Sequence, residues 1–487
     1  MVCDVLSLFS ELFERFIEEF VGPRGQRIYF SLLNHGKMPS RRDFLLGVGG
    51  VAGSVPLANT TTASAAATTA PTRTWTRTYA PATAVTNEGR ALVRDIVPMT
   101  NGVALVGLAG GSDHYHGWIG RVDAAGRSRW HHLDETGQST LLAGTPSRDD
   151  ADGIVAAGGT NLTASHLAPR HADPYALRVG ADGDVSWTHT YQPSAADGRA
   201  TAIANVTDGY VVAGNETVGN DERLWAAHLD SHGTRSWTWH SERAGSVNAI
   251  TSVPGGVIIA GSTGPVGADS PAPSGRQEVA WIGKLTNSGS LTWQWHVDHN
   301  AGERIEDLAP APNGGVVAVG RRGFSADDRG VGWLVALDSD GQKRWEQTYP
   351  QDGWNWHHGI ASVDTGYVLV GTRAAEPDTD ADARGAWLLR VDAEGQVVWE
   401  HQAEPGTGGF AVQPLGDGGL LVGGAASTDG HAGEVAWLAK VGGDPTSGTT
   451  AEDVLSLPTL PDWTTPLVAG TVIGALGARA VASWRQS

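Results

Sequence analysis

The sequence predicts an all-β protein in which seven similar four-stranded units form one closed ring. The first observation is a phrase that recurs about every 50 residues: a Gly-rich apolar run, a loop, an aromatic-led strand, a tight Gly turn and a Trp. Repeats of four short strands at this spacing are typical of β-propeller blades. The apolar runs begin at Gly102, Gly153, Gly209, Gly255, Gly314, Gly366 and Gly418, and the leading aromatics are Trp118, Tyr175, Trp225, Trp281, Trp333, Trp387 and Trp437.

The second observation is that the last repeat is cut short. Closing tryptophans follow the first six leads, at Trp130, Trp187, Trp237, Trp293, Trp345 and Trp399, whereas the phrase that starts at Trp437 breaks off. The missing piece stands at the other end of the repeats, in the segment RTWTRTY around Trp75. We therefore expect this segment to pair with residues 437–441 as the outer strand of the last blade, which closes the ring and removes two sheet edges.

Each repeat divides into four strands, a to d. Strand a precedes the Gly-rich turn, as in Ala91–Val97, and strand b follows it, as in Tyr210–Gly214. Both are short apolar runs bounded by turn residues, which is the pattern of a β-strand. A loop of variable length leads to strand c, as in Trp333–Asp338, and a hairpin turn containing Gly341 leads to strand d with its Trp345. We expect the repeated tryptophans to pack between neighbouring blades.

The charge pattern bears on the environment and on partners. The net charge of −19 argues against nucleic acid, which needs a basic face. Nearly all positive charge is Arg, because lysines occur only at positions 37, 284, 343 and 440. This profile resembles that of exported proteins of halophilic archaea. The one cysteine, Cys3, lies outside the repeats, which excludes thiolate chemistry there. We expect a monomer.

The N-terminal part resembles a twin-arginine export signal. Arg41 and Arg42 precede an apolar Gly-rich run and the small residues of 63–67. We assign 38–70 to the signal, with Met38 as the true start and 1–37 as a non-native extension; the alternative is an amphipathic helix over Leu6–Phe20.

The C-terminal part predicts a membrane anchor. Residues 444–465 have the composition of a stalk, and 466–484 form an apolar run just long enough to span a bilayer. Arg479 and Arg485 would lie on the cytoplasmic side, which leaves the propeller, 71–443, outside the cell. A processed sorting tail or an amphipathic helix are the alternatives.

The loops indicate where a ligand would bind. The b–c and d–a loops vary in length and share one face of the ring, and variable loops on a rigid scaffold are common binding sites. Where strand a enters the channel, aligned repeats place polar or aromatic side chains that we predict to form a small-ligand or glycan site at the channel mouth: Arg94, Thr201, Asn248, Glu306, His358 and Phe410, with Trp354, Trp356 and His357 beside them. The alternative is a water-filled channel.

Other patterns are less specific. His114 and His116 could offer imidazoles to a metal from one strand face, and Asp378, Asp380 and Asp382 alternate as in a calcium loop but lack its Gly and Glu. Asn161 and Asn215 stand in glycosylation sequons. The chain contains no G-x-S-x-G, P-loop or H-E-x-x-H motif, so we assign no catalytic residue and no metal site.

The phrase W-x-x-x-[LV]-D-x-x-G-x-x-x-W, clearest at 118–130, 333–345 and 387–399, resembles the docking motif of PQQ-like quinoprotein propellers and the repeats of uncharacterised exported surface propellers of haloarchaea. The resemblance covers residues 73–443 and implies the propeller architecture. It also implies a pyrroloquinoline quinone (PQQ) cofactor with calcium. Such dehydrogenases, however, have eight blades and often a vicinal disulfide, whereas this chain has seven repeats and no cysteine within them.

Three functions follow as hypotheses. The first is a membrane-anchored surface propeller that binds a glycan, peptide or envelope protein through its loop-rich face without a cofactor. The second is a PQQ-dependent dehydrogenase of alcohols or sugars. The third is a structural surface protein without a discrete ligand. We favour the first, because propellers host many chemistries and the repeat pattern specifies architecture only.

Overall fold

A computed structural model describes residues 70–443 with internal gaps at 80–89, 112–114, 135–137, 151, 164–170, 192–196, 219–220, 265–277, 298–301, 313, 325–328, 351–353, 375–383 and 428–433. The expected export signal with Arg41 and Arg42, the stalk and the C-terminal anchor lie outside the described residues. Within the described residues, no helix is long and apolar enough to cross a membrane.

The described strands form antiparallel sheets, five of four strands and one of seven. The first two sheets contain β2 (Arg90–Met99), β3 (Gly102–Gly110), β4 (Tyr115–Asp123) and β5 (Ser128–Leu133), and β6 (Thr140–Pro146), β7 (Ile154–Thr163), β8 (His171–Val179) and β9 (Val185–Thr190). The seven-stranded sheet contains β10 (Asp197–Val206), β11 (Gly209–Val218), β12 (Asp221–Leu229), β13 (Arg235–Val253), β14 (Gly256–Thr263), β15 (Val279–Thr286) and β16 (Leu291–Val297).

The remaining three sheets complete the ring. They contain β17 (Glu303–Pro310), β18 (Val316–Phe324), β19 (Arg329–Leu337) and β20 (Lys343–Tyr349); β21 (Trp354–Val363), β22 (Gly366–Ala374), β23 (Arg384–Val391) and β24 (Val397–Pro405); and β25 (Thr407–Pro414), β26 (Leu420–Ser427), β27 (Glu434–Val441) and β1 (Arg73–Tyr79).

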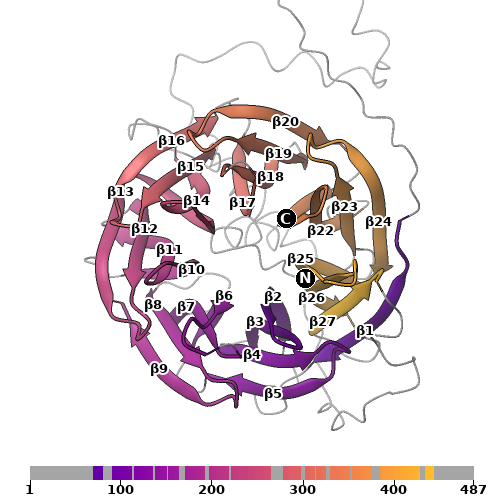
Figure 1. Ribbon diagram of the computed structural model, residues 1–487, viewed down its shortest axis with the longest axis horizontal. Helices are drawn as coiled ribbons and strands as arrows, with labels where there is room; N and C mark the ends of the chain where they lie inside the picture. Colours follow the sequence, from indigo (N-terminus) through magenta and orange to yellow (C-terminus); the bar gives the residue numbers. More distant parts are fainter. Residues whose placement is uncertain are drawn as a thin grey trace, which may run out of the picture. The chain divides into compact units, whose positions relative to one another are not determined.

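The sheets stand around a common centre, as in a β-propeller. The first strand of each repeat lies next to the centre and the last strand lies at the rim, as β2 and β5 or β17 and β20 show in Figure 1. Strand β13 has both positions: its first half pairs with β12, and its second half, from Gly245, pairs with β14. It therefore passes from the rim of one repeat to the centre of the next without a loop. The prediction of an all-β propeller is confirmed.

The N-terminal strand closes the ring, as the sequence predicts. Strand β1 pairs antiparallel with β27, from Arg73 opposite Val441 to Tyr79 opposite Ala436. The Nε1–H of Trp437 donates to Thr76 Oγ1 at 2.9 Å, and Thr74 Oγ1 donates to the carbonyl oxygen of Gly442 at the same distance. Trp75 is 6 % exposed and belongs to one hydrophobic cluster with β2, β3, β26 and β27. The two ends of the repeat region are therefore held together by backbone pairing and by a shared core.

Closing tryptophans link neighbouring repeats at six places. The indole of Trp75 covers Gly126 in the β4–β5 turn so closely that a Cβ there would lie 2.7 Å from the ring. The same contact joins Trp130 to Gly183, Trp187 to Gly233, Trp237 to Gly289, Trp293 to Gly341 and Trp345 to Gly395. Gly126 also has a φ of 75°, which side chains disfavour. The spacing of Gly and Trp in the phrase thus reflects a contact between blades.

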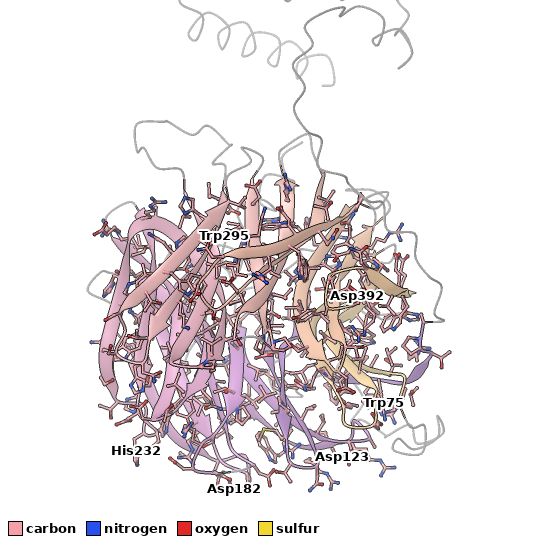
Figure 2. The ribbon with its side chains drawn as sticks, turned by 45° about the horizontal axis from the view of Figure 1, so that its top comes forward. Trp75, Asp123, Asp182, His232, Trp295 and Asp392 are labelled. Carbon is pink, nitrogen blue, oxygen red and sulfur yellow. The ribbon has the colours of Figure 1, made fainter. Side chains whose placement is uncertain are left out.

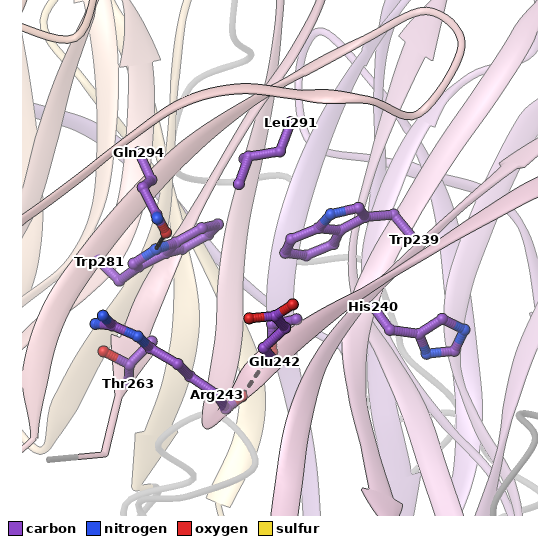
Figure 3. Close-up of a pocket in the computed structure, with 9 residues that line it drawn as sticks. Trp239, His240, Glu242, Arg243, Thr263, Trp281, Leu291 and Gln294 are labelled. Atoms are coloured by element: carbon purple, nitrogen blue, oxygen red, sulfur yellow. Dashed lines mark hydrogen bonds between the residues drawn. The ribbon is translucent and has the colours of Figure 1, made fainter. Parts of the chain in front are cut away.

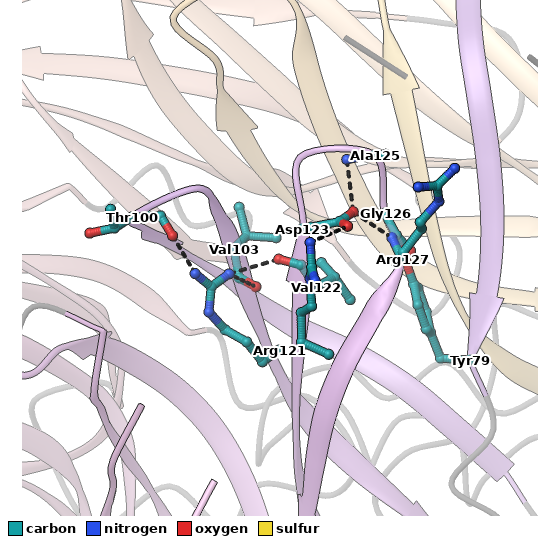
Figure 4. A network of polar contacts seen from close by, with 10 residues as sticks. Tyr79, Thr100, Val103, Arg121, Val122, Asp123, Ala125, Gly126 and Arg127 are labelled. Atoms are coloured by element: carbon teal, nitrogen blue, oxygen red, sulfur yellow. Dashed lines mark hydrogen bonds and ion pairs between the residues drawn. The ribbon is translucent and has the colours of Figure 1, made fainter. Parts of the chain in front are cut away.

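The turn itself depends on an aspartate, as Figure 4 shows for the β4–β5 turn. Asp123 Oδ1 accepts hydrogen bonds from the backbone N–H groups of Ala125 at 3.0 Å and Arg127 at 2.9 Å. Tyr79 donates its hydroxyl proton to the Gly126 carbonyl oxygen at 2.7 Å and so ties β1 to the same turn. The equivalent aspartates at 230, 338 and 392 accept the same pair of backbone hydrogen bonds. In Figure 2, Asp123, Asp182 and His232 lie along one face, which carries the c–d turns; the b–c and d–a connections leave from the opposite face.

Candidate functional site

A β-bulge interrupts the inner strand of every repeat at the same place. The pairing register skips one residue in β2, β6, β10, β13, β17, β21 and β25. A bulge leaves one residue unpaired and re-aims its side chain. The skipped residues are Arg94, Leu142, Thr201, Asn248, Glu306, His358 and Phe410. The positions that sequence alignment selected are therefore the bulges, with Leu142 as the one that it missed.

The bulge explains the glycine that ends each apolar run of strand b. A Cβ at Gly320 would lie 1.9 Å from the carbonyl oxygen of Arg304, and one at Gly371 would lie 1.7 Å from that of Trp356. The bulged inner strand thus approaches strand b at a point where only glycine fits. The glycine therefore marks, in the sequence, the place where one residue of the inner strand leaves the pairing ladder.

Glu306 connects two arginines near the channel. Its Oε1 lies 3.3 Å from Arg304 Nε and 3.8 Å from Arg321 Nε. Arg304 Nη2 also donates to Asn248 Oδ1 at 3.2 Å, and Asn248 Nδ2 donates to the carbonyl oxygen of Ile305 at 2.7 Å. The side chain of Arg304 is only 1 % exposed, so this network is a buried ion-pair cluster. Such a cluster holds its members in place, because removal of one partner leaves a buried charge without compensation.

Aromatic rings stand beside this cluster. The Arg94 guanidinium carbon lies 5.5 Å from the centroid of Phe410, and His358 meets the same ring edge-on at 5.3 Å. Trp356 lies edge-on to His358 at 6.3 Å, and the Arg321 guanidinium lies 5.7 Å from the Trp356 ring. Both arginines are within the distance for a cation–π interaction. Bulge residues of β2, β21 and β25 thus come together with β18, although they lie far apart in the sequence.

The ionisation of these groups reflects their burial. Desolvation lowers the pKa of Arg94 to about 10, against the opposing effect of Glu306, so Arg94 stays a cation at neutral pH. Desolvation, and then the positive charges of Arg94 and Arg321, lower the pKa of His358 to about 3. His358 is therefore a neutral imidazole. The site presents guanidinium groups, a neutral imidazole and aromatic faces, which suit a ligand with a carboxylate and an apolar ring or stem.

The residue after the bulge is an aspartate in two strands. Asp95 accepts hydrogen bonds from the N–H groups of Ile96 and Gly144, and Asp307 accepts them from Leu308 and Ile360, all at 2.8–2.9 Å. Each carboxylate thus joins its own inner strand to the next one around the channel. Burial raises the pKa of both, that of Asp307 to about 7.

Two of the predicted site residues do not join this cluster. His357 is fully buried between repeats, with its ring 4.2 Å from that of Trp387, and it occupies the position of Val93 and Val247 in other inner strands. Because side chains alternate along a strand, it points away from His358. The hydroxyl of Thr201 donates to the Val247 carbonyl oxygen at 2.7 Å and is 9 % exposed. Of the predicted set, the structure brings together Arg94, Asn248, Glu306, Trp356, His358 and Phe410.

The structure describes only some of the metal and glycosylation candidates. His114, Asp378, Asp380 and Asp382 lie outside the described residues, whereas His116 Nδ1 lies 2.8 Å from the Asp134 carbonyl oxygen. In the described ranges, no group of three His, Cys, Asp or Glu side chains could hold a metal ion. Asn161 is exposed at a φ of 55°. Asn215 is 2 % exposed and accepts the Val247 N–H, so its prediction as a glycosylation site is wrong for the folded protein.

Sequence reasoning missed Arg304 and Arg321. Arg304 stands in strand a two residues before the bulge, and Arg321 directly follows the strand b glycine. The segment Gly320-Arg321-Arg322 places charge inside an otherwise apolar strand, and this departure from the other repeats is the feature that could have revealed it.

Comparisons with known proteins give remote structural likenesses only. No family model matches the chain, and no curated protein matches it. Similar solved structures include Sqt1 of Chaetomium thermophilum (15 % identity, 69 % of this chain, 80 % of that chain, TM-score 0.42) and the β-propeller domain of the Trilobed protease of Pyrococcus furiosus (8 %, 73 %, 94 %, 0.40). Another is an apocarotenoid oxygenase of Synechocystis (9 %, 65 %, 73 %, 0.40).

Proposed function

We propose that this protein is an exported surface propeller of seven blades, anchored to the membrane by its C-terminal segment, that binds a ligand at the mouth of its channel. The blade count follows if β13 is divided between two blades, because the seven-stranded sheet then contributes two of them. Export by the twin-arginine route and anchoring rest on the sequence patterns at the two ends of the chain.

The observation that carries the binding proposal is the set of side chains at the bulges of the inner strands. The bulge itself belongs to the repeat, since it also occurs at Leu142 in β6. The binding proposal rests on the side chains that the bulges turn out of the ladder, which in β2, β17, β21 and β25 are Arg94, Glu306, His358 and Phe410. A buried charge costs stability unless it is paired, and ionisable groups perturbed by burial cluster at functional sites.

The chemistry favours a ligand with a carboxylate beside a ring or an apolar stem. Arg94 would pair with the carboxylate, and the faces of Phe410 and Trp356 would stack on the ring. An acidic glycan, or an acidic side chain or C-terminus of a peptide or envelope protein, has this combination. The face opposite the c–d turns would supply further contacts, since the variable connections leave from it.

Binding can be measured on glycan and peptide arrays with the full chain in high salt. We expect acidic ligands to bind and Arg94→Gln to weaken them about tenfold or more, because it removes a charge-assisted hydrogen bond. Val185→Ala, at an exposed position of rim strand β9, serves as the matched control and should bind as the wild type does. Binding that is indifferent to Arg94→Gln would refute the channel-mouth site.

The same preparations test the two alternatives. A bound quinone chromophore in the absorbance spectrum, with dye-linked oxidation of an alcohol or sugar, would favour the PQQ-dependent dehydrogenase. If the folded protein binds no ligand on either array, the structural role would be favoured.

A further inference from the structure

A groove at the rim of the propeller forms a second candidate site, distinct from the channel. It lies where β13 passes from one repeat to the next, beside β15 and β16, and encloses a cavity of about 290 Å³. Figure 3 shows Trp239 and Trp281 on two sides of it, with the Glu242 carboxylate between them and Arg243 beside Thr263. We call this the rim groove; its lining also includes His240, Ser241, Thr263, Leu291 and Gln294.

The walls of the rim groove offer aromatic surface. The rings of Trp239 and Trp281 are 6.0 Å apart and nearly parallel, at 17°. Trp281 is 2 % exposed, and its Nε1–H donates to Gln294 Oε1 at 3.1 Å, so it is fixed in place. Trp239 is half-buried, and Leu291, at 37 % exposed, stands beside the pair. The groove therefore has a rigid aromatic wall that is partly open to solvent.

The equivalent place in the following repeats is filled by ion pairs. There the residue two positions after the strand b glycine is Arg322 or Arg373, and the residue that accepts from the leading indole is Glu346 or Glu400. Arg322 lies 3.0 Å from Glu346, which also binds Lys343 at 2.7 Å, and Arg373 lies 3.4 Å from Glu400. In the rim groove, Thr263, Gln294 and Leu291 stand at the positions of Arg322, Glu346 and Lys343. The ion-pair network is absent here, because Thr263 and Leu291 are shorter than Arg322 and Lys343 and Gln294 carries no charge.

One polar atom in the rim groove has no partner within the described part of the chain. Thr263 is 2 % exposed, and its Oγ1 is buried without a hydrogen bond to any described residue. A buried hydroxyl without a partner is unfavourable by about 1–3 kcal/mol in general. Thr263 is one of the residues that line the cavity, but its hydroxyl oxygen is itself shielded, so a ligand would reach it only after the side chain rotates.

We propose that the rim groove binds the pyranose ring of a neutral sugar. The apolar C–H face of the ring would stack on Trp239, while its hydroxyl groups would donate to the Glu242 carboxylate and accept from Arg243. Glu242 and Arg243 carry opposite charges, so the edge of the groove favours hydroxyl groups over a net charge on the ligand. An aromatic face with a few convergent polar groups is the usual composition of a small-ligand pocket.

The neighbouring repeats supply the variant that tests the site. Thr263→Arg combined with Gln294→Glu copies the Arg–Glu pair that fills the equivalent place at Trp333 and Trp387, so the fold should tolerate it. Trp239→His copies the residue at the same position of other rim strands, His189 and His401. Neither change touches the channel.

Binding of methyl glucoside, methyl galactoside and methyl mannoside can be followed by saturation-transfer NMR and calorimetry on the full chain. We expect at least one to bind saturably to the wild type, and the double variant and Trp239→His each to weaken it about tenfold or more. Arg94→Gln, in the channel, should leave this binding unchanged.

Absence of binding by all three glycosides, or binding that survives the double variant in folded protein, would overturn the proposal. The channel-mouth proposal would stand in either case, because its acidic ligands and its variant are different. Binding lost in Arg94→Gln but kept in the double variant would assign the sugar to the channel instead.

Discussion

Closure of the ring by β1 can be tested at Trp75. Its indole is 6 % exposed and packs on Gly126, so Trp75→Ala removes the main apolar contact between β1 and the first repeat. A buried aromatic ring of this size covers about 200 Å², which at about 25 cal/mol per Å² corresponds to roughly 5 kcal/mol. The alanine keeps part of this and the site relaxes, so we expect a loss of about 4 kcal/mol in the free energy that holds β1 in place.

Hydrogen exchange measures that free energy locally. Amides of β1 and β27 that pair with each other exchange when β1 detaches, and a loss of about 4 kcal/mol corresponds to about a thousandfold faster exchange, at 1.4 kcal/mol per factor of ten. Amides of β10 and β11, on another part of the ring, should change far less. Tyr79→Phe, which removes only the 2.7 Å hydrogen bond to Gly126, should accelerate exchange about tenfold or less. Exchange in β1 that rises by less than tenfold in Trp75→Ala would refute the closing role of this strand.

Three further predictions concern the inner strands. Gly320→Ala should destabilise the protein by about 3 kcal/mol or more in urea unfolding, because its Cβ would lie 1.9 Å from the Arg304 carbonyl oxygen, whereas Gly416→Ala, with nothing within 4 Å, should be nearly neutral; equal effects would contradict the close approach. His357→Val should stabilise the protein increasingly as the pH falls below 6.5, by about 2 kcal/mol at pH 5 relative to pH 7.5. The reason is that folding holds the pKa of His357 at about 3, so that at these pH values only the unfolded chain gains the proton. A change in stability that does not depend on pH would contradict this. For Asp307, whose pKa is about 7, the sign is opposite, because the folded carboxyl keeps a proton that the unfolded one releases. The wild type should therefore lose stability as the pH rises from about 4 to 7. Asp307→Asn should not show this loss, so the difference in unfolding free energy between variant and wild type should grow with pH over that range.

The candidate site was partly predictable. Alignment on the strand b glycine identified the bulge residues because the glycine and the bulge are one structural feature, a close approach of two strands. Alternation along β21 would have separated His357 from His358, but the sequence alone presents them as an adjacent pair in a loop. Arg304 was missed because it stands two residues before the bulge, outside the aligned position. Arg321 was missed because it belongs to the next strand, β18. Only folding brings both within 4 Å of Glu306.

The sequence by itself determined the architecture, since the repeated phrase encodes local features that need no knowledge of distant neighbours: period-two apolar strands, Asp-capped turns and the Gly–Trp contact between repeats. It also determined the closure, because an incomplete last repeat and a stray strand at the start can only complete each other. The tertiary structure decided which side chains meet across the channel and which positions are filled or hollow at the rim. Those outcomes depend on packing between residues of different repeats, and the same strand position holds an ion pair in one repeat and a cavity in another.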